Sequence, residues 1–538
     1  MLPTVGIDLG TTFSALAFVD SGGQPQVIPN SSGGLVTPSV VWFNGHDAWV
    51  GEKANARKMT TPNDIKEFIK RDIGKPVEST HALYDELQSD LRDVAPYEIG
   101  GFKYGAAGLS GIILRYLKKQ ALRHFRKIGL TSETDDTKCV LPAVVTVPAY
   151  FGEQERRETR LAGFVAGLDV VGVLNEPTAA ALAFGLMRRE DQMILVVDLG
   201  GGTFDVTLLR MAGEDAIVLA TRGHNALGGR DFDELVQRHL LDQARRRTGV
   251  EVDVAAGFEI QRLATEAKHA LSEQDAYTVT FSHAGQDLDI VLQRKPPGDP
   301  SWDLDLMTSG IDSAEEFYFE ERSSNLLHHC RALCESVVEG VTVRTVSGAR
   351  PATWKDVGEI VLAGGSCKMP MIAEMLERVT GKRIRRQIEG FSHDTSIAVG
   401  AALYGTHRER VHDVLSHGLG VKLVRQGREF VDILMAKDSN IPQAVERTYR
   451  AAERAILEVW EGDSEDPDHC TLRGRLDLDN PEGRVTIAME VDADGCLTVS
   501  GDYPPTGRKQ VAIRNALFDY QGRATELFRR IQNLTIHV

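Results

Sequence analysis

The sequence predicts a two-lobed α/β domain followed by an all-β sandwich domain. The first observation is a glycine-rich hairpin pattern that occurs twice, at Val5–Phe18 and at Ile194–Leu209. Each copy has an apolar strand, an aspartate, a glycine and threonine turn and a second apolar strand, which indicates two similar lobes facing one cleft. The second observation is the alternation of apolar and polar residues over 485–499, which is typical of half-buried paired strands.

The composition is that of a globular protein and argues against several classes of ligand. Of the 538 residues, 42% are hydrophobic and 26% are charged, and the net charge of −16 argues against nucleic acid. No apolar run approaches the ~18 residues that cross a bilayer, and the first residues lack the basic segment of a signal peptide. The six cysteines have no metal-site spacing. We therefore expect a protein of the reducing cytoplasm with no membrane partner.

The second hairpin contains residues suited to binding phosphate and metal. Its three successive glycines leave backbone N–H groups uncovered, Asp198 at the strand end would face a metal ion, and Thr203 could donate its hydroxyl. Alone, this pattern is equally an ordinary glycine turn, but its repetition in one chain favours a nucleotide cleft. The glycines and the matching residues of the first hairpin are Gly200, Gly201, Gly202, Asp8, Gly10, Thr11 and Thr12.

The segments between the hairpins predict alternating strands and helices. Strands are expected at Val36–Phe43 and at Val144–Phe151, of which the second ends at Pro148. Apolar residues at helical spacing predict an amphipathic helix over 107–127. A further helix is expected directly after the second strand, and it contains Arg156.

Two positions in this region have a structural and a functional interpretation. Lys70, in the string FIKRDIG, is either part of a solvated basic face or directed at a phosphate. Glu176 precedes Pro177, whose ring restricts it to extended geometry. The carboxylate of Glu176 either caps the following helix or orients a water molecule.

Beyond the second hairpin, glycine turns again precede predicted helices. A Gly-Gly turn that opens a helix suits a phosphate or a ribose, and a lysine and a serine four residues apart share one helix face. A long helix is expected over about 314–346, and a helix of small residues follows an aspartate near residue 394. The candidate residues of these segments are Gly228, Gly229, Lys268, Ser272, Gly364, Gly365 and Asp394.

The composition changes near residues 406–418, which is the best candidate for an interdomain linker. We predict a first domain over 1–407, a linker over 408–418, a sandwich over 419–514 and a short tail over 515–538. A short helix is expected in the tail at about 523–533. Besides the strands of 485–499, the sandwich strands are expected at Gly420–Val424, Phe430–Met435, Ala455–Trp460, Thr471–Leu478 and Gln510–Ile513.

Seven strings in this order resemble the seventy-kilodalton heat-shock protein family of DnaK-type chaperones. They are GIDLGTTFSA, FIKRDIG, VPAYF, LNEPTAAALAFG, VVDLGGGTFDVTLL, LGGRDFD and VLAGGSCKMP. The resemblance implies an actin-like ATPase domain, a linker and a β-sandwich that binds extended apolar peptides. It also implies ATP, Mg²⁺ and K⁺ as cofactors, and a J-domain co-chaperone and a nucleotide-exchange factor as partners. The family's C-terminal helical lid is expected to be missing.

The resemblance assigns roles to the residues of the cleft. Asp8 and Asp198 match residues that hold Mg²⁺ through its water shell, and Asp205 matches a position near the monovalent cation. Lys70 matches the phosphate-directed lysine, and Glu176 matches the carboxylate near the attacking water. The catalytic set is then Lys70, Glu176, Asp198 and Thr203, with the phosphates held by Gly10, Thr11, Thr12, Gly200, Gly201, Gly202 and Thr203.

The resemblance also implies residues that hold adenosine, residues that relay between the nucleotide and the peptide domain, and residues that line the peptide groove. Lys368 stands where the family has an arginine, and Thr265 where it has a glutamate, so an altered nucleotide affinity is expected. The linker is shortened, which weakens the expected coupling. The adenosine set is Gly228, Gly229, Lys268, Ser272, Gly364, Gly365, Lys368 and Asp394, the relay is Pro148 and Arg156, and the groove is Val421, Val424, Tyr449 and Ile456.

Three functions are compatible with these features. The first is an ATP-dependent chaperone that binds unfolded peptide segments under the control of ATP hydrolysis. The second is a nucleotide-switched scaffold whose β-domain holds one dedicated partner, which the shortened linker and missing lid would suit. The third and weakest is a small-molecule kinase. Binding of many unrelated apolar peptides would favour the chaperone over the scaffold.

Overall fold

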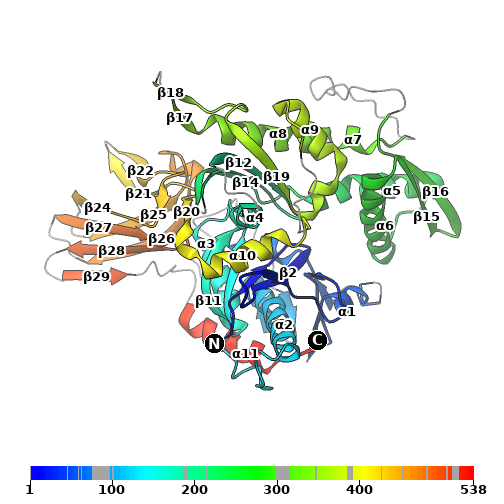
Figure 1. The fold of residues 1–538 in the computed structure, drawn as a ribbon, viewed down its shortest axis with the longest axis horizontal. Coiled ribbons are helices and arrows are strands. Elements are labelled where there is room, and N and C mark those ends of the chain that lie inside the picture. Colours follow the sequence, from blue (N-terminus) through cyan, green and yellow to red (C-terminus); the bar gives the residue numbers. More distant parts are fainter. Residues whose placement is uncertain are drawn as a thin grey trace.

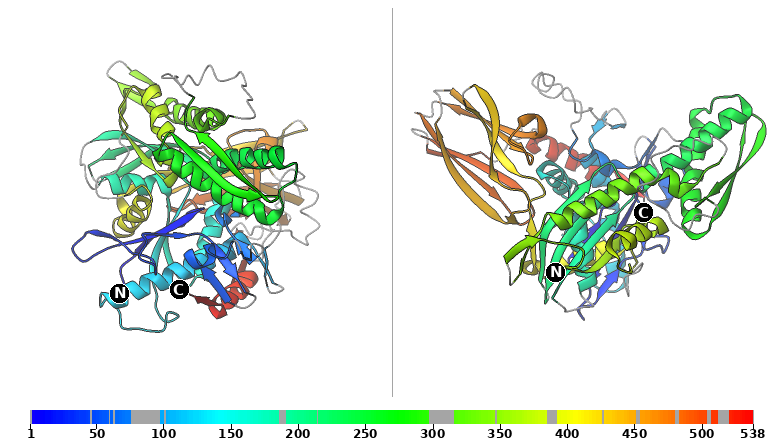
Figure 2. Two further views of the ribbon diagram at one scale, coloured as in Figure 1. Left: turned by 90° about the vertical axis from the view of Figure 1, so that its right-hand side faces the viewer. Right: turned by 90° about the horizontal axis from the view of Figure 1, so that it is seen from above.

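The computed structural model describes residues 2–44, 47–58, 60–61, 64–75, 97–99, 102–185, 191–213, 215–296, 316–345, 348–384, 392–425, 427–450, 454–479, 483–503, 507–511 and 520–537. They form two α/β units and a β-sandwich (Figure 1). The sandwich lies at one end of the molecule and the hairpin of β15 (Ala276–His283) and β16 (Gln286–Gln293) lies at the other (Figures 1 and 2).

Unit I is built on a six-stranded sheet near the N-terminus. Its strand β1 pairs in parallel with β10 and antiparallel with β2. Strands β1 and β10 are buried along their whole length, which explains why most of their residues are apolar. Helices α2 and α3 pack against each other and complete the core. The elements are β1 (Val5–Asp8), β2 (Phe13–Val19), β3 (Pro25–Val27), β4 (Val36–Pro38), α2 (Ala106–Lys127), β10 (Pro142–Val147), α3 (Glu153–Val165) and β11 (Asp169–Asn175).

Unit II repeats this arrangement in its own six-stranded sheet. Strand β12 pairs antiparallel with β13 and in parallel with β19, as β1 does with β2 and β10. One hydrophobic core joins this sheet to helices α5, α6, α8 and α9. The elements are β12 (Gln192–Leu199), β13 (Phe204–Ala212), β14 (Asp215–His224), α5 (Gly229–Thr248), α6 (Val254–Glu273), α8 (Ser324–Glu339), β19 (Val357–Ala363) and α9 (Pro370–Thr380). Both predicted glycine-rich hairpins are confirmed.

Two helices of small residues pack against each other between the two sheets. Helix α4 (Glu176–Gly185) contacts strands of unit II, and α10 (Ser396–Thr406) contacts β1 and β2 of unit I. A Cβ added at Gly400 would lie only 1.7 Å from the carbonyl oxygen of Ala179. Gly400 is therefore required for the close approach of the two helices.

The β-sandwich consists of two four-stranded sheets, β22-β21-β25-β26 and β24-β27-β28-β29. One core contains inward residues of both sheets, including Val421, Val459, Ile487 and Met489. The strands are β21 (Leu419–Arg425), β22 (Arg428–Met435), β24 (Gln443–Arg450), β25 (Arg454–Glu461), β26 (Thr471–Asp479), β27 (Arg484–Val491), β28 (Leu497–Tyr503) and β29 (Gly507–Val511).

Part of the predicted linker, 408–418, forms a strand that joins unit II to the sandwich. Strand β20 (Val411–Val414) pairs in parallel with β14, where Val411 lies opposite Ala216. It also pairs antiparallel with β23 (Asn440–Ile441), where Asp413 lies opposite Ile441. The sandwich is therefore docked at the edge of the unit II sheet.

The C-terminal residues fold back onto unit I (Figure 1). Helix α11 (Tyr520–Asn533), which confirms the helix expected at 523–533, packs against α2 and α3. Strand β30 (Thr535–His537) pairs in parallel with β6 (Asp47–Val50). The Arg115 guanidinium of α2 donates to the carbonyl oxygens of Gln532 at 2.8 Å and Leu534 at 3.0 Å.

Three predicted elements differ from the structure. The strand expected at Val36–Phe43 is split into β4 and β5 (Val41–Phe43), which belong to different sheets because Pro38 cannot donate to the ladder. The helix expected over 314–346 is shorter: the described part has α7 (Phe319–Arg322), α8, and then a hairpin of β17 (Thr342–Thr345) and β18 (Gly348–Pro351). Of the strand expected at 510–513, residues 512 and 513 lie outside the described residues. The remaining elements are α1 (Glu52–Asn55), β7 (Ile65–Lys66), β8 (Tyr97–Ile99), β9 (Phe102–Tyr104) and the short 3₁₀ turns η2 (Ile69–Asp72), η3 (Gly365–Lys368), η4 (Arg408–Arg410) and η5 (Pro467–His469).

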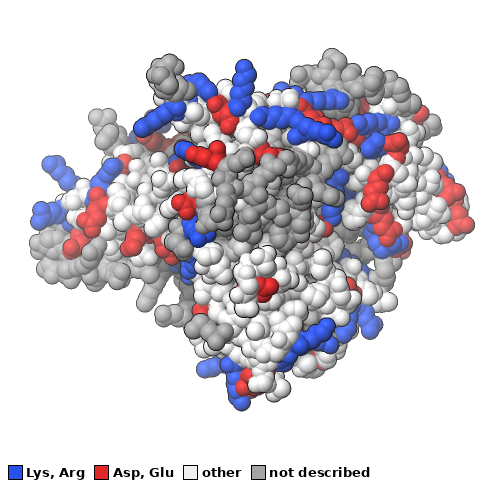
Figure 3. Space-filling model, in the orientation of Figure 1, with Lys and Arg blue, Asp and Glu red and all other residues white. Residues whose placement is uncertain are grey.

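Acidic and basic side chains are interspersed over the face of the molecule drawn in Figure 3. Among the described residues, many charged side chains form ion pairs, such as Arg210 with Asp191 at 2.6 Å and Arg350 with Asp356 at 2.7 Å. Within the described part of the chain, no helix has both the length and the apolar character that crossing a bilayer requires.

Glu320 on α7 leads to a prediction about the pH dependence of stability. Its buried carboxylate lies near Arg294, Lys295 and Glu374, and burial raises its pKa from 4.5 to about 7. Because the folded state binds this proton more tightly than the unfolded state, stability falls as the pH rises from about 4.5 to about 7. Glu320→Gln, which cannot ionise, is expected to raise Tm by a few degrees at about pH 8 and to change it little at about pH 4. Calorimetry at both pH values measures this, and equal shifts would contradict it.

Candidate active site

A cleft of about 1000 Å³ is lined by residues of both α/β units. The hairpin β1–β2 and the turn η2 contribute from unit I, and the hairpin β12–β13, α5, α6 and the turn after β19 contribute from unit II. The sequence-predicted residues that line it are Asp8, Gly10, Thr11, Thr12, Lys70, Glu176, Asp198, Gly200, Gly201, Thr203, Gly229, Lys268, Ser272, Gly364, Gly365, Lys368 and Asp394.

The two glycine turns touch each other at the bottom of the cleft. A Cβ added at Gly201 would lie 1.9 Å from the Thr12 hydroxyl oxygen, and one added at Gly202 would lie 2.6 Å from the Thr11 methyl carbon. A Cβ added at Gly228, at the start of α5, would lie 2.6 Å from the backbone nitrogen of Gly202. Side chains at these positions would force the turns apart. The glycines therefore allow the turns of the two units to approach closely, and a turn without side chains leaves backbone amides accessible to a phosphate.

Lys70 and Glu176 form a buried ion pair inside the cleft. Lys70 lies on η2 and is 5% exposed, and Glu176 begins α4 and is 6% exposed. Neither side chain is on a solvated face, so the structural interpretation of Lys70 as a surface lysine is excluded.

Three aspartates surround this pair and carry strongly shifted pKa values. Burial, followed by the charge of Glu176, raises the pKa of Asp8 to about 8 and that of Asp205 to about 7. Burial raises the pKa of Asp198 well above its usual range in the same way. Lys70 opposes each shift but is one cation among four carboxylates. The cluster therefore favours an added cation.

The oxygen atoms of the cluster fit a hydrated divalent cation. One carboxylate oxygen of Asp198 and one of Asp205 are buried and have no hydrogen-bond partner among the described residues. Carboxylate oxygen is the donor that Mg²⁺ prefers. No group of three or more such ligands is close enough, within the described residues, to hold an ion directly. These carboxylates would therefore bind the ion through its waters.

The opposite end of the cleft contains a second set of polar side chains. Lys268 donates to the carbonyl oxygen of Gly229 at 3.0 Å and pairs with Asp233 at 2.8 Å. Lys368 pairs with Asp394 at 2.6 Å, and Ser272 donates to the carbonyl oxygen of Lys268. These residues line a space in which ribose and base would lie beyond the phosphates. Lys368, in place of an arginine, offers an alkyl stem there but no planar group.

One chain of hydrogen bonds connects the cleft to β20. Arg156 on α3 donates to the side-chain oxygen of Asn175, and Asn175 donates to Asp413 Oδ2 at 2.9 Å. Asn175 directly precedes Glu176. Burial raises the pKa of Asp413, and Arg156 opposes that shift. This network therefore connects the residue next to Glu176 with the strand that docks the sandwich.

A second chain runs through the turn after Pro148. The backbone N–H of Tyr150 donates to Asp205 Oδ1 at 3.1 Å, and the Tyr150 ring lies edge-on to His417, with centroids 4.6 Å apart. Ser416 donates to the carbonyl oxygen of Ala149 at 2.6 Å. Of the predicted relay residues, Arg156 contacts Asn175 of the first chain, and Pro148 directly precedes the turn of the second chain.

Sequence reasoning missed the central residue of this interface, Asp494. It lies in the turn between β27 and β28, and its buried carboxylate pairs with Arg160 and Arg408 and accepts from the backbone N–H of Val173 at 3.2 Å. Its carbonyl oxygen accepts from Arg156 at 3.3 Å. An acidic residue at a turn is common, so the sequence carried no signal for this role.

The predicted groove residues do not all lie on one surface. Val421 is fully buried in the sandwich core, whereas Val424 and Ile456 are 66% and 61% exposed on the outward faces of neighbouring strands. Tyr449 is half-buried, and its hydroxyl donates to Asp432 at 2.7 Å. Residues three apart on a strand lie on opposite faces, so Val421 and Val424 cannot line one groove. We remove Val421 from the expected set.

The fold and the cleft define a class of protein: two matching α/β units enclose a cleft that contains two glycine turns, and hydrogen bonds connect residues beside that cleft to a docked β-sandwich. The family model described as Hsp70 protein matches residues 4–296 and 315–521. The chain therefore belongs to the Hsp70 family, as the sequence strings indicated. Members of this family are ATP-dependent chaperones with ATPase activity, and they bind ATP with Mg²⁺.

Proposed function

We propose that this chain couples ATP hydrolysis in an actin-like, two-lobed domain to the binding and release of extended apolar peptides by the β-sandwich. The observation that carries the proposal is the pair of hydrogen-bonded paths from the cleft to the sandwich. Asp205 is bonded to the Tyr150 backbone, and Asn175, next to Glu176, is bonded to Asp413. A change in the nucleotide can thus alter the docking of the sandwich.

In the hydrolysis step, the residues of the cleft position the triphosphate and a water molecule. The backbone amides of the two glycine turns bind the phosphates, and Lys70 neutralises the charge that develops on the terminal phosphate. Glu176 orients the attacking water once Lys70 turns to the phosphate. Asp8 and Asp198 would hold hydrated Mg²⁺, which supplies charge neutralisation when bound, and Asp205 would face K⁺.

The adenosine moiety is assigned to the far end of the cleft. Lys268, Ser272, Lys368 and Asp394 would contact it, with Gly364 and Gly365 leaving room for the base. We further propose unfolded segments, a J-domain co-chaperone and a nucleotide-exchange factor as partners. The compartment proposed is the cytoplasm, since all six cysteines are free and all lie within the described residues.

The proposal is tested by fluorescence anisotropy of a labelled, extended apolar peptide. Peptide bound with ADP should leave faster after an ATP chase. Ile456→Asp should weaken binding at least about tenfold, because a charge would replace an exposed apolar contact. Val291→Asp, at a similarly exposed valine on β16, is the matched control and should bind normally.

Other outcomes would lead to different conclusions. ATP hydrolysis with no peptide binding in either nucleotide state would contradict the chaperone and favour a scaffold with one dedicated partner. Phosphate transfer to a small hydroxyl acceptor, with no ADP formed in its absence, would favour a kinase. Equal loss of affinity in the Ile456 and Val291 variants would place the peptide elsewhere.

A further inference from the structure

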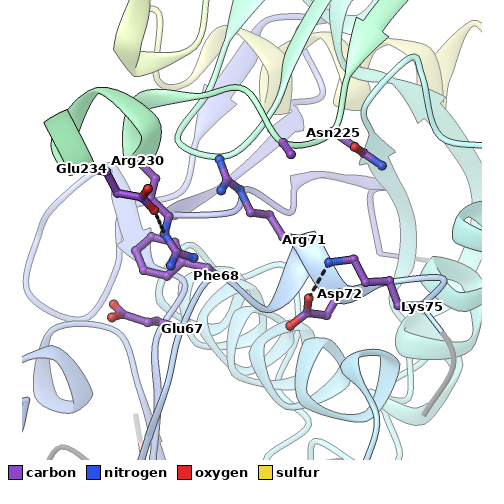
Figure 4. Close-up of a pocket in the computed structure, with 9 residues that line it drawn as sticks. Glu67, Phe68, Arg71, Asp72, Lys75, Asn225, Arg230 and Glu234 are labelled. Carbon is purple, nitrogen blue, oxygen red and sulfur yellow. Dashed lines mark hydrogen bonds and ion pairs between the residues drawn. The ribbon is translucent and has the colours of Figure 1, made fainter. Parts of the chain in front are cut away.

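A second, smaller pocket of about 280 Å³ lies at the boundary of the two α/β units. One wall comes from residues 67–75 of unit I and the other from residues 225–234 of unit II (Figure 4). Phe68 and Arg230 line both this pocket and the cleft. Side chains that cross this boundary link the two units close to the phosphate site.

Arg71 is the centre of these cross-boundary contacts. From η2 in unit I it donates through Nε to the carbonyl oxygen of Gly202 at 3.1 Å, and through Nη2 to Asp231 at 2.7 Å. Asp231 accepts in addition from the backbone N–H of Gly228 at 2.7 Å, so it also caps α5. A single guanidinium therefore joins unit I to the glycine turn and to the helix behind it.

The glycine turn itself is attached to the start of α5. The backbone N–H of Gly229 donates to the carbonyl oxygen of Gly200, and that of Arg230 donates to Gly201, both at 2.9 Å. The turn and the helix start thus form one rigid piece of unit II. Arg71 holds this piece from the opposite side of the boundary.

A second contact crosses the boundary beside Arg71. The Arg230 guanidinium lies over the ring of Phe68, 4.5 Å from its centroid, and Figure 4 shows the two side by side. Phe68 has a φ of 57°, which bulky residues rarely adopt, so its surroundings must hold it there. It directly precedes η2, which carries both Lys70 and Arg71.

We propose that Arg71 is a positioning residue that clamps the phosphate turn of unit II against unit I. The clamp consists of Arg71, Asp231 and Gly202, supported by the contact of Arg230 with Phe68, and the proposal rests on the proposed ATP hydrolysis. While it is closed, Lys70 and the amides of the glycine turn face the same phosphate. Nucleotide release requires the units to separate, so the clamp must open first.

The test compares the release of a fluorescent ADP analogue with single-turnover ATP hydrolysis. Arg71→Ala is expected to release the analogue about tenfold faster and to hydrolyse ATP at least about tenfold more slowly. Arg71→Lys has one ammonium that cannot hold Asp231 and Gly202 together, so intermediate rates are expected. Lys75→Ala is the matched control, because Lys75 pairs with Asp72 inside unit I and should leave both rates within twofold of wild type.

The Asp231→Asn variant distinguishes an effect of losing the clamp from an effect of a general loss of structure. It retains the size of the side chain but removes the charge that Arg71 binds, so it should also speed release. The double variant of Arg71→Ala and Asp231→Asn should release no faster than Arg71→Ala alone. Release rates of the Arg71 and Asp231 variants equal to wild type would overturn the clamp. Wild-type protein that binds the analogue but does not hydrolyse ATP would instead overturn the proposed function, while leaving the release measurement valid.

Discussion

Replacing Lys70 with alanine is expected to lower the kcat of ATP hydrolysis at least about 100-fold. Lys70 is the cation that opposes the pKa shifts of Asp8, Asp198 and Asp205. Without it, four buried carboxylates would face the terminal phosphate, and Glu176 would lose its partner. Single-turnover hydrolysis with saturating ATP and Mg²⁺ measures the loss directly.

The removal of Lys70 also leaves Glu176 as an unpaired buried charge, which can destabilise a protein by about 3–5 kcal/mol. The double variant of Lys70→Ala and Glu176→Gln removes that charge and should restore the Tm without restoring hydrolysis. Lys75→Ala, on the same short segment, is the control for a general effect of losing a lysine. A folded Lys70→Ala protein that hydrolyses ATP within fivefold of wild type would contradict the assigned role.

The second large effect is expected from Ile531→Ala in the C-terminal helix α11. Ile531 is fully buried in the core of unit I, next to Gly111 of α2. Truncation of a buried isoleucine costs about 2–5 kcal/mol through lost burial and the cavity that remains. The loss should appear in unit I, because α11 packs against α2 and α3. Urea unfolding followed by hydrogen exchange of the α2 amides measures it.

A matched control and a local probe make this result specific. Arg529→Ala changes an exposed residue of the same helix and should leave the stability within about 0.5 kcal/mol of wild type. The Trp49 ring stacks on His537 of β30, with centroids 4.4 Å apart, so detachment of the C-terminal strand should alter Trp49 fluorescence. Faster exchange limited to α11, with α2 unchanged, would show that the tail is not part of the unit I core.

The docking of the C-terminal residues has a consequence for the sandwich. In the sequence, the sandwich follows β20, which pairs with β14 of unit II. It precedes β30, which pairs with β6 of unit I. The sandwich is thus attached at both ends of its sequence, to different units. Any relative movement of the two units must therefore be accommodated by these two attachments.

Much of the fold could be predicted because its signals are local. The hairpins around Asp8 and Asp198 each lie within about twenty residues. Their glycine turns therefore depend on neighbouring residues in the sequence and not on the rest of the fold. The alternation over 485–499 likewise specifies β27 and β28 by side-chain period alone. The opposite faces of Val421 and Val424 follow from the same period, so that error could have been avoided from the sequence.

The sequence by itself determined the two glycine hairpins, the residue types of the cleft and the strands of the sandwich, because each depends on neighbours along the chain. Only the tertiary structure decided that Arg71 reaches Asp231, that Asp494 lies at the centre of the interface, and that Ile531 completes the core of unit I. These pairings join residues more than eighty positions apart. Their formation depends on how whole elements pack, and no local propensity or spacing encodes it.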